Sequence, residues 1–291
     1  RSVQSSLADM IESFLAPWHA AVSALPFEWA RFGFMRLALL AVLLVSPLLG
    51  ALGTVVVANR MTFFSEAIGH AAFTGIALGV LLGLASPMWS MIGFALLLTL
   101  AIAWFRRRGG LSSDTAIGLV MAFTVSLGIV ILSRGGDFAR YTNFLIGDML
   151  AVTAADVAWL ALLAVFVAAS FFFFFNRLLL GSLSPAIARS RAKNSGAAEL
   201  AFACLLAVVV TCALPWIGIL VINALLILPA AAARNLASNT GQFFGWSVAI
   251  SFVAGIAGLV VSFYASTATG ATIVLVAMAI YLLTLLRRTA S

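Results

Sequence analysis

The chain is 291 residues long, with 64% hydrophobic residues, only 9% charged residues and a formal net charge of +7. So few polar residues cannot cover a soluble globule of this size, which excludes a water-soluble protein. Apolar runs recur along the chain, each about the 20 residues with which a helix crosses a hydrocarbon core. They do not alternate in polarity as the strands of a membrane barrel do, so the sequence predicts an all-α, polytopic membrane helical bundle.

Residues 1–30 differ from the rest because charges are mixed with large aromatic side chains, among them Trp18 and Trp29. That mixture predicts an amphipathic segment in the membrane interface, with His19 as an interfacial residue. No long linker divides the remaining chain, so residues 31–291 are interpreted as one transmembrane domain.

Nine membrane spans are predicted from the positions of the apolar runs. They cover residues 33–57, 62–84, 88–105, 112–133, 154–176, 197–214, 216–233, 243–264 and 268–286. Merging the short pair 197–214 and 216–233 would give eight spans instead. Polar residues interrupt the stretch 134–153, which predicts a loop with a short re-entrant or surface helix.

Basic residues gather in the short turns between the apolar runs, for example Arg106–Arg108 and Arg287–Arg288. Loops rich in arginine and lysine stay in the cytoplasm, so this distribution indicates membrane topology and not a nucleic-acid site. With nine spans and a cytoplasmic C-terminus, residues 1–30 lie on the outer side. Arg31 and Arg36 argue instead for a cytoplasmic location of residues 1–30, because arginines near a span favour that side.

Gly75, Gly79 and Gly83 recur at four-residue spacing in the second predicted span and share one helix face. Small residues at this spacing allow two helix backbones to come close together in lipid. We therefore predict that these glycines pack against a neighbouring helix.

Ionisable residues are rare inside the predicted spans because they are expensive in hydrocarbon, and Glu66 and His70 stand out for this reason. They are four residues apart and so lie on one face of a helix. Carboxylate oxygen and imidazole nitrogen make half of a site for zinc, manganese or iron, and a symmetric dimer would supply the other half. The alternative is that the two side chains only satisfy each other near a helix end.

Pro229, Arg234 and Ser238 fall in a segment of small residues that ends the seventh predicted span. One interpretation is a short helix lying at the cytoplasmic face. The other is a proline-containing span with a basic end, and composition alone favours this one.

Motifs for nucleotide hydrolysis and for common membrane or hydrolytic enzymes are absent from the sequence. There is no Gly-x-x-x-x-Gly-Lys-Ser/Thr phosphate loop, no His-Glu-x-x-His and no Gly-x-Ser-x-Gly. The sequence therefore predicts a transport subunit without an ATPase site of its own, and not an enzyme.

Five segments carry a resemblance to a known family. They are Arg60–Gly79, Ser113–Gly118, Phe144–Asp148 with Leu150, Gly218–Arg234 and Gly270–Leu275. In this order they resemble the permease subunits of the bacterial zinc, manganese and iron ABC importers, over roughly residues 26–288.

The resemblance implies a type II ABC importer permease in the bacterial cytoplasmic (inner) membrane, working by ATP-driven alternating access. It implies a homodimer of permeases, two ATP-binding subunits, an extracytoplasmic metal-binding protein, and no permanently bound cofactor besides the transported metal. It also implies that Glu66 and His70 lie near the central pathway, although the family more commonly has aspartate where this chain has Glu66. By the same resemblance, the region of Pro229, Arg234 and Ser238 docks the ATPase.

Two other transport functions stay open. A permease for a larger metal chelate, of the siderophore or cobalamin type, would use a wide apolar pathway without need of a histidine in the membrane. A secondary transporter driven by an ion gradient predicts broken helices in corresponding halves and several buried carboxylates, and the sequence shows no such symmetry.

Overall fold

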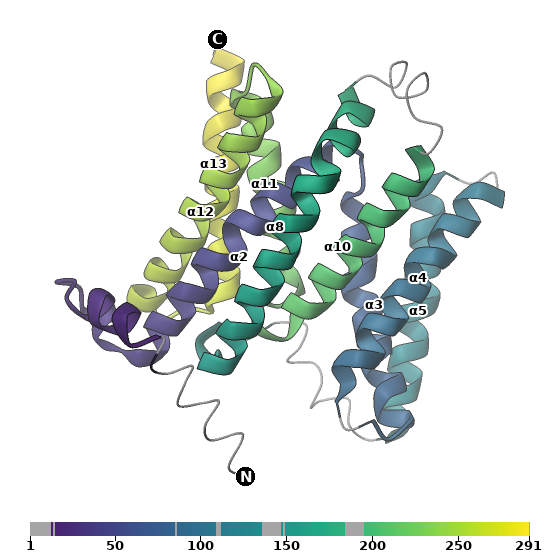
Figure 1. Cartoon of the computed structure of the whole chain (residues 1–291), viewed down its shortest axis with the longest axis horizontal. Coiled ribbons are helices and arrows are strands. Elements are labelled where there is room, and N and C mark those ends of the chain that lie inside the picture. The colour runs from purple at the N-terminus through teal and green to yellow at the C-terminus, as the bar shows by residue number, and fades with distance from the viewer. Residues whose placement is uncertain are drawn as a thin grey trace.

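The computed structural model describes residues 13, 15–84, 86–108, 112–135, 147, 149–183 and 195–290. This part of the chain forms helices joined by turns (Figure 1). The helices are η1 (Glu28–Arg31), α2 (Gly33–Ala58), α3 (Thr62–Leu81), α4 (Pro87–Arg108), α5 (Ser113–Gly135), η2 (Met149–Ala151), α8 (Ala154–Leu183), α10 (Ser195–Ile217), α11 (Ile219–Leu236), α12 (Thr240–Ala265) and α13 (Thr269–Ala290). Residues 15–23 form a further helix that precedes η1.

Nine helices of the described chain are long and apolar enough to cross a membrane, and they coincide with the nine predicted spans. The polytopic helical bundle is therefore confirmed, and α10 and α11 are two separate helices and not one merged helix. The predicted spans 197–214 and 216–233 place the break between the two helices at Pro215. In the structure, Pro215 lies inside α10. The break falls at Gly218, whose φ of 80° is accessible to glycine at little cost. Most of the predicted loop 134–153 lies outside the described residues.

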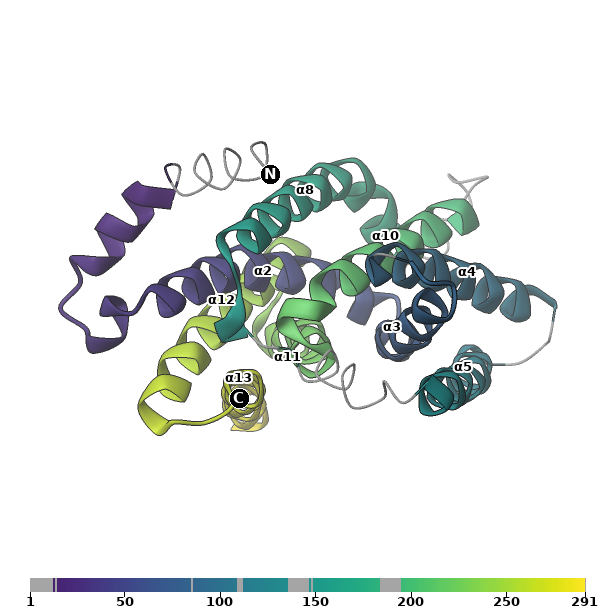
Figure 2. The same ribbon diagram turned by 90° about the horizontal axis from the view of Figure 1, so that it is seen from below.

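The spans run side by side, and α2 lies among the helices of one half of the bundle (Figures 1 and 2). α2 packs against α12, α11 and α8, whereas α3 packs against α4 and α5. α10 contacts helices of both groups, and α11 lies between α13 and α3. A continuous core of buried apolar side chains joins these helices into one body.

Small residues and hydroxyl groups form the contact between α2 and α12. A Cβ atom on Gly50 would lie 2.7 Å from Ser251 Cβ, and one on Gly255 would meet Ser46 Oγ. Ser251 Oγ donates a hydrogen bond of 2.6 Å to the carbonyl oxygen of Ser46, and Ser247 Oγ donates one of 2.7 Å to that of Gly50. Such close backbone contact and interhelical hydrogen bonds hold helices together in lipid, where apolar side chains gain little by leaving the hydrocarbon.

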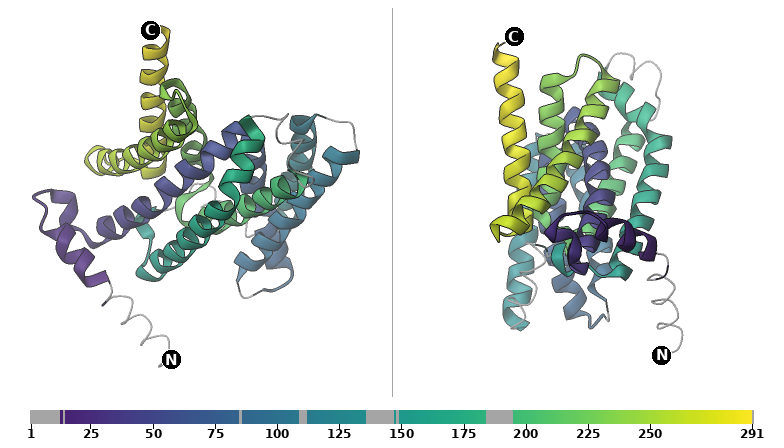
Figure 3. Two further views of the ribbon diagram at one scale, coloured as in Figure 1. Left: turned by 45° about the horizontal axis from the view of Figure 1, so that its top comes forward. Right: turned by 90° about the vertical axis from the view of Figure 1, so that its left-hand side faces the viewer.

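The helix that precedes η1 lies across the direction of the spans, at the end of the bundle where α2 begins (Figure 3). Arg36 of α2 holds this N-terminal segment. Its guanidinium donates to the carbonyl oxygens of Ala30 at 2.9 Å, Arg31 at 2.7 Å and His19 at 3.4 Å. In return, Trp18 Nε1 donates to the carbonyl oxygen of Arg36 at 3.0 Å. The segment is thus tied to the first span.

The two ends of the bundle differ in their number of arginines. The end that holds the last turn of α13 carries, among the described residues, Arg60, Arg106, Arg234, Arg287 and Arg288. The opposite end, where α2 begins, carries Arg31, Arg36 and Arg134. We call the first of these the basic end.

Candidate functional site

Glu66 and His70 lie one turn apart on α3, and both are half-buried. Ala67 and Ile68, which point to other sides of the helix, are fully buried. Phe63 lies on nearly the same side as His70, two turns earlier, and is 56% exposed. The pair therefore lies on a side of α3 that the described chain covers incompletely.

Neighbouring helices cover the other sides of α3. Gly69 faces α11, Gly75 faces α4 and Thr74 faces α5, where its hydroxyl donates a hydrogen bond of 2.5 Å to a backbone carbonyl. Each helical residue advances by about 100°, which places Glu66 and His70 between the directions of Gly69 and Thr74. We call this side of α3, between α11 and α5, the open face.

Glu66 and His70 do not form a complete metal site within one chain. No three His, Cys, Asp or Glu side chains gather anywhere in the part of the chain that the structure describes. Asp148, which belongs to one segment of the family resemblance, lies outside that part. Two protein ligands leave a divalent ion with most of its coordination positions unfilled. The pair offers one carboxylate and one imidazole that further ligands must complete.

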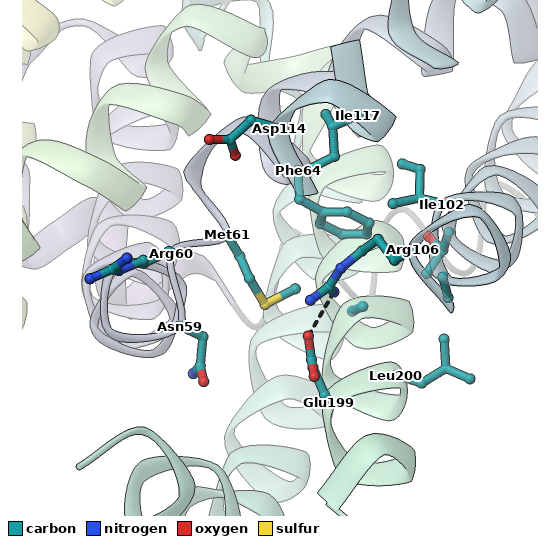
Figure 4. A pocket seen from close by; sticks show the side chains of 13 residues that line it. Asn59, Arg60, Met61, Phe64, Ile102, Arg106, Asp114, Ile117, Glu199 and Leu200 are labelled. Atoms are coloured by element: carbon teal, nitrogen blue, oxygen red, sulfur yellow. Dashed lines mark hydrogen bonds and ion pairs between the residues drawn. The ribbon is translucent and has the colours of Figure 1, made fainter. Parts of the chain in front are cut away.

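A pocket of about 570 Å³ opens at the basic end, between the α2–α3 turn, α4, α5 and α10 (Figure 4). An ion pair of 2.7 Å joins Arg106 Nη1 to Glu199 Oε1 in its wall, and the two side chains are 40% and 43% exposed. Arg60 and Asp114 also line the pocket, so two positive and two negative side chains face it. Solvent screens charges as exposed as these, and the pair contributes little to stability.

This pocket is separate from the open face. Met61, which precedes α3, and Phe64 of α3 line the pocket, and Phe64 points to the opposite side of the helix from Glu66. The Arg106–Glu199 pair could not be found from sequence, because the two residues are 93 positions apart and no local pattern links them.

The segment of Pro229, Arg234 and Ser238 lies at the basic end, where α11 meets α12. Pro229 is buried inside α11, which runs on without a break, so a separate short helix at this place is wrong. Arg234 and Ser238 are exposed. The turn is fixed by two hydrogen bonds of 2.9 Å: Gln242 N donates to Asn239 Oδ1, and Ser238 N donates to Gln242 Oε1. The exposed part of the segment is therefore a tight, well-defined corner.

Gly75 and Gly79 lie where α3 approaches α4 most closely. A Cβ atom on Gly75 would lie 2.6 Å from Met91 Cα, a distance that real Cβ atoms do not reach. A Cβ atom on Gly79 would meet Ser90 Oγ. A side chain at Gly75 would push the helices apart because it would meet backbone atoms of α4, whereas one at Gly79 would first displace the Ser90 hydroxyl.

Gly83 lies beyond the end of α3, and its predicted role in packing on the same face is wrong. Its φ is 66°, and a Cβ atom there would find no atom within 4 Å. Gly83 N donates to the carbonyl oxygen of Val80 at 3.0 Å, and Leu84 N donates to that of Gly79 at 2.9 Å. These two bonds form a Schellman motif, in which glycine takes the left-handed position and ends the helix.

A bundle whose described part has nine helices long and apolar enough to cross a membrane, with a carboxylate and an imidazole on one half-buried helix face, has the architecture of a multi-pass membrane permease. Residues 31–288 match the ABC 3 transport family, and the chain therefore belongs to that family. The resemblance inferred from the five sequence segments is confirmed.

Two relatives and one solved structure show what the chain is similar to. The high-affinity zinc uptake system membrane protein ZnuB of Haemophilus influenzae is 29% identical, over 86% of this chain and 96% of its own length. The manganese transport system membrane protein MntC of Listeria innocua is 29% identical, over 88% and 91%. The structure of PsaBC from Streptococcus pneumoniae in complex with Fab superposes with a TM-score of 0.76 at 26% identity, covering 93% of this chain and 95% of that one.

Proposed function

We propose that this chain is the membrane-spanning permease subunit of an ABC importer that carries a divalent transition metal ion, Zn²⁺, Mn²⁺ or Fe²⁺, into the cytoplasm of a bacterium. The observation that carries the proposal is the pair of Glu66 and His70 on the open face of α3. Ionisable groups within a membrane span cost free energy to bury in hydrocarbon, and they typically serve ion passage. The zinc and manganese in the names of two relatives agree with these ligand types.

A second copy of the chain completes the ligand set in this proposal. Two copies related by a twofold axis at the open face bring two carboxylates and two imidazoles together. Four such ligands suit Zn²⁺, and water can add to them around Mn²⁺ or Fe²⁺. Phe63 and Leu220 beside the pair are 56% and 59% exposed, so the described chain leaves this face free for a second copy. Ligands divided between two chains also release the ion when the chains move.

The basic end faces the cytoplasm in this proposal, because loops rich in arginine are retained there. Two ATP-binding subunits dock at that end, in part on Arg234 and Ser238, and supply the free energy, while this chain hydrolyses no ATP. Pro229 is buried and acts by shaping α11. A metal-binding protein delivers the ion at the opposite, outer end, where the N-terminal segment lies in the membrane interface. ATP binding and hydrolysis then switch the permease pair between outward-open and inward-open states.

The test is ATP-dependent uptake of Zn²⁺, Mn²⁺ and Fe²⁺ into membrane vesicles that contain the complete importer. We expect the native complex to accumulate at least one of these metals only when ATP is supplied. Glu66→Ala and His70→Ala are each expected to lower that uptake about tenfold or more, because each removes half of the chain's ligand pair. Trp89→Ala is the control, since Trp89 lies on α4 with 75% of its surface exposed.

Three results would contradict parts of the proposal. Unchanged uptake in both Glu66→Ala and His70→Ala would show that the pair is structural. Uptake of a metal chelate but of none of the free ions would favour the chelate permease. Uptake driven by an ion gradient without ATP would favour a secondary transporter. Co-purification of the ATP-binding subunits with each variant confirms that the complex has assembled.

A further inference from the structure

One amide lies within the apolar sequence of α11. Asn223 is four residues after Ile219, and the side chains between them are aliphatic. The Asn223 Oδ1 atom is buried and accepts no hydrogen bond from the described chain. Buried acceptors are normally satisfied, so an unsatisfied one inside a membrane span needs an explanation, and a bound ligand or ion is one partner that would satisfy it.

Helix geometry places Asn223 at the same depth as Glu66. Gly69 of α3 lies against the side chain of Ile219 of α11. The two helices run in opposite directions, because α3 begins and α11 ends at the basic end (Figure 1). About one turn from this contact toward the basic end, α11 presents Asn223 and α3 presents Glu66.

The two side chains also point to the same side of the α3–α11 contact. Around the axis of α3, the direction of Glu66 lies about 60° from that of Gly69. Around the axis of α11, the direction of Asn223 lies about 40° from that of Ile219. Both rotations have the same sense when each helix is viewed from its own first residue. Because the helices are antiparallel, these rotations carry both side chains toward the open face. Leu220, which lies further round α11 in this direction, is 59% exposed. Figure 2 shows α11 and α3 as neighbours between α13 and α5.

We propose that Asn223 is a third metal ligand of the pathway, whose amide oxygen coordinates the transported divalent cation beside Glu66 and His70. This inference rests on the proposed function. No further His, Cys, Asp or Glu of the described chain joins Glu66 and His70 in a group of three. A neutral amide oxygen on the adjoining helix is a further ligand that the described part of the chain offers.

The added oxygen has a consequence for metal preference. With Asn223, two copies of the chain offer two carboxylates, two imidazoles and two amide oxygens. Six ligands rich in oxygen suit octahedral Mn²⁺, whereas Zn²⁺ prefers four ligands in a tetrahedral arrangement. Asn223 therefore shifts the preference of the pathway toward Mn²⁺ relative to Zn²⁺.

The test compares initial rates of ATP-driven Mn²⁺ and Zn²⁺ uptake by the complete importer in vesicles, with the same metal-binding protein throughout. Any change in the Mn²⁺-to-Zn²⁺ ratio then comes from the permease. Asn223→Leu keeps the size and removes the oxygen, so we expect Mn²⁺ uptake and the ratio to fall about tenfold. Asn223→Asp keeps an oxygen ligand and is expected to retain Mn²⁺ uptake.

Thr211→Val is the matched control, because Thr211 on α10 also has a buried oxygen without a hydrogen-bond partner but is fully enclosed. It is expected to retain both rates.

An unchanged ratio in Asn223→Leu, with uptake abolished in His70→Ala, would overturn the inference and leave the proposed function standing. A native importer that carries Zn²⁺ but not Mn²⁺ would overturn it as well. A native complex without ATP-driven uptake of any metal would refute the proposed function itself, and the inference with it.

If Asn223→Leu fails to assemble with the ATP-binding subunits, Asn223→Asp decides the question. Retained Mn²⁺ uptake with an unchanged or raised Mn²⁺-to-Zn²⁺ ratio would support the amide as a ligand. Loss of Mn²⁺ uptake in an assembled Asn223→Asp complex would overturn the inference, because an added carboxylate should strengthen coordination of a hard cation.

Discussion

Glu66 has one methylene more than an aspartate would have at this position, and the extra length changes its reach without changing its ligand chemistry. It lies half-buried on α3, one turn before His70. In the proposed pathway, a carboxylate here would offset part of the charge of a passing cation, which a neutral group of the same shape cannot do. The charge and the reach of Glu66 can therefore be tested separately.

We predict that Glu66→Gln lowers ATP-driven metal uptake about tenfold or more, because it removes the anionic ligand at constant size. Glu66→Asp keeps the carboxylate and should retain uptake, with a changed ratio among Zn²⁺, Mn²⁺ and Fe²⁺. Initial rates in vesicles measure both effects. Equal uptake by Glu66→Gln and the native chain would show that the charge of Glu66 plays no part in transport.

At the scale of helices, contacts through small residues set how closely the spans approach. Gly75 on α3 leaves no space for a side chain, because its Cβ atom would lie 2.6 Å from Met91 Cα of α4. Gly93 on α4 is the contrasting case, since a Cβ atom there would have no atom within 4 Å. The same substitution at these two positions therefore separates helix packing from helix propensity.

We predict that Gly75→Ala destabilises the purified protein by about 1–3 kcal/mol, the usual range for overpacking a tight contact. Gly93→Ala should leave the stability unchanged or raise it slightly, because alanine favours the helix over glycine. The midpoint of thermal unfolding in detergent, followed by tryptophan fluorescence, measures both. Equal midpoints for the two variants would show that α3 and α4 are not held at this distance in the folded protein.

At the scale of the whole molecule, hydropathy located the nine described spans because a helix in lipid must be apolar along its length. Glu66 and His70 could be selected because charges inside spans are rare. Asn223 was not selected, since an amide carries no charge and a single polar residue does not interrupt an apolar run. The role of Gly83 in ending α3 depends on its φ of 66°, which composition does not reveal. The Arg106–Glu199 ion pair depends on a contact between helices that are distant in the sequence, which composition does not reveal either.

The proposed pathway depends on how two whole molecules meet. Two copies are proposed to meet at the open face and to bring two Glu66/His70 pairs together. The most direct measurement is cross-linking between copies at position 70. In a chain without Cys204 and Cys212, His70→Cys is treated with a short thiol-reactive cross-linker, and Trp89→Cys on the exposed side of α4 is the control. We predict a covalent dimer for His70→Cys and none for Trp89→Cys. Absence of a covalent dimer at position 70, in chains that still assemble with the ATP-binding subunits, would contradict the proposed pathway.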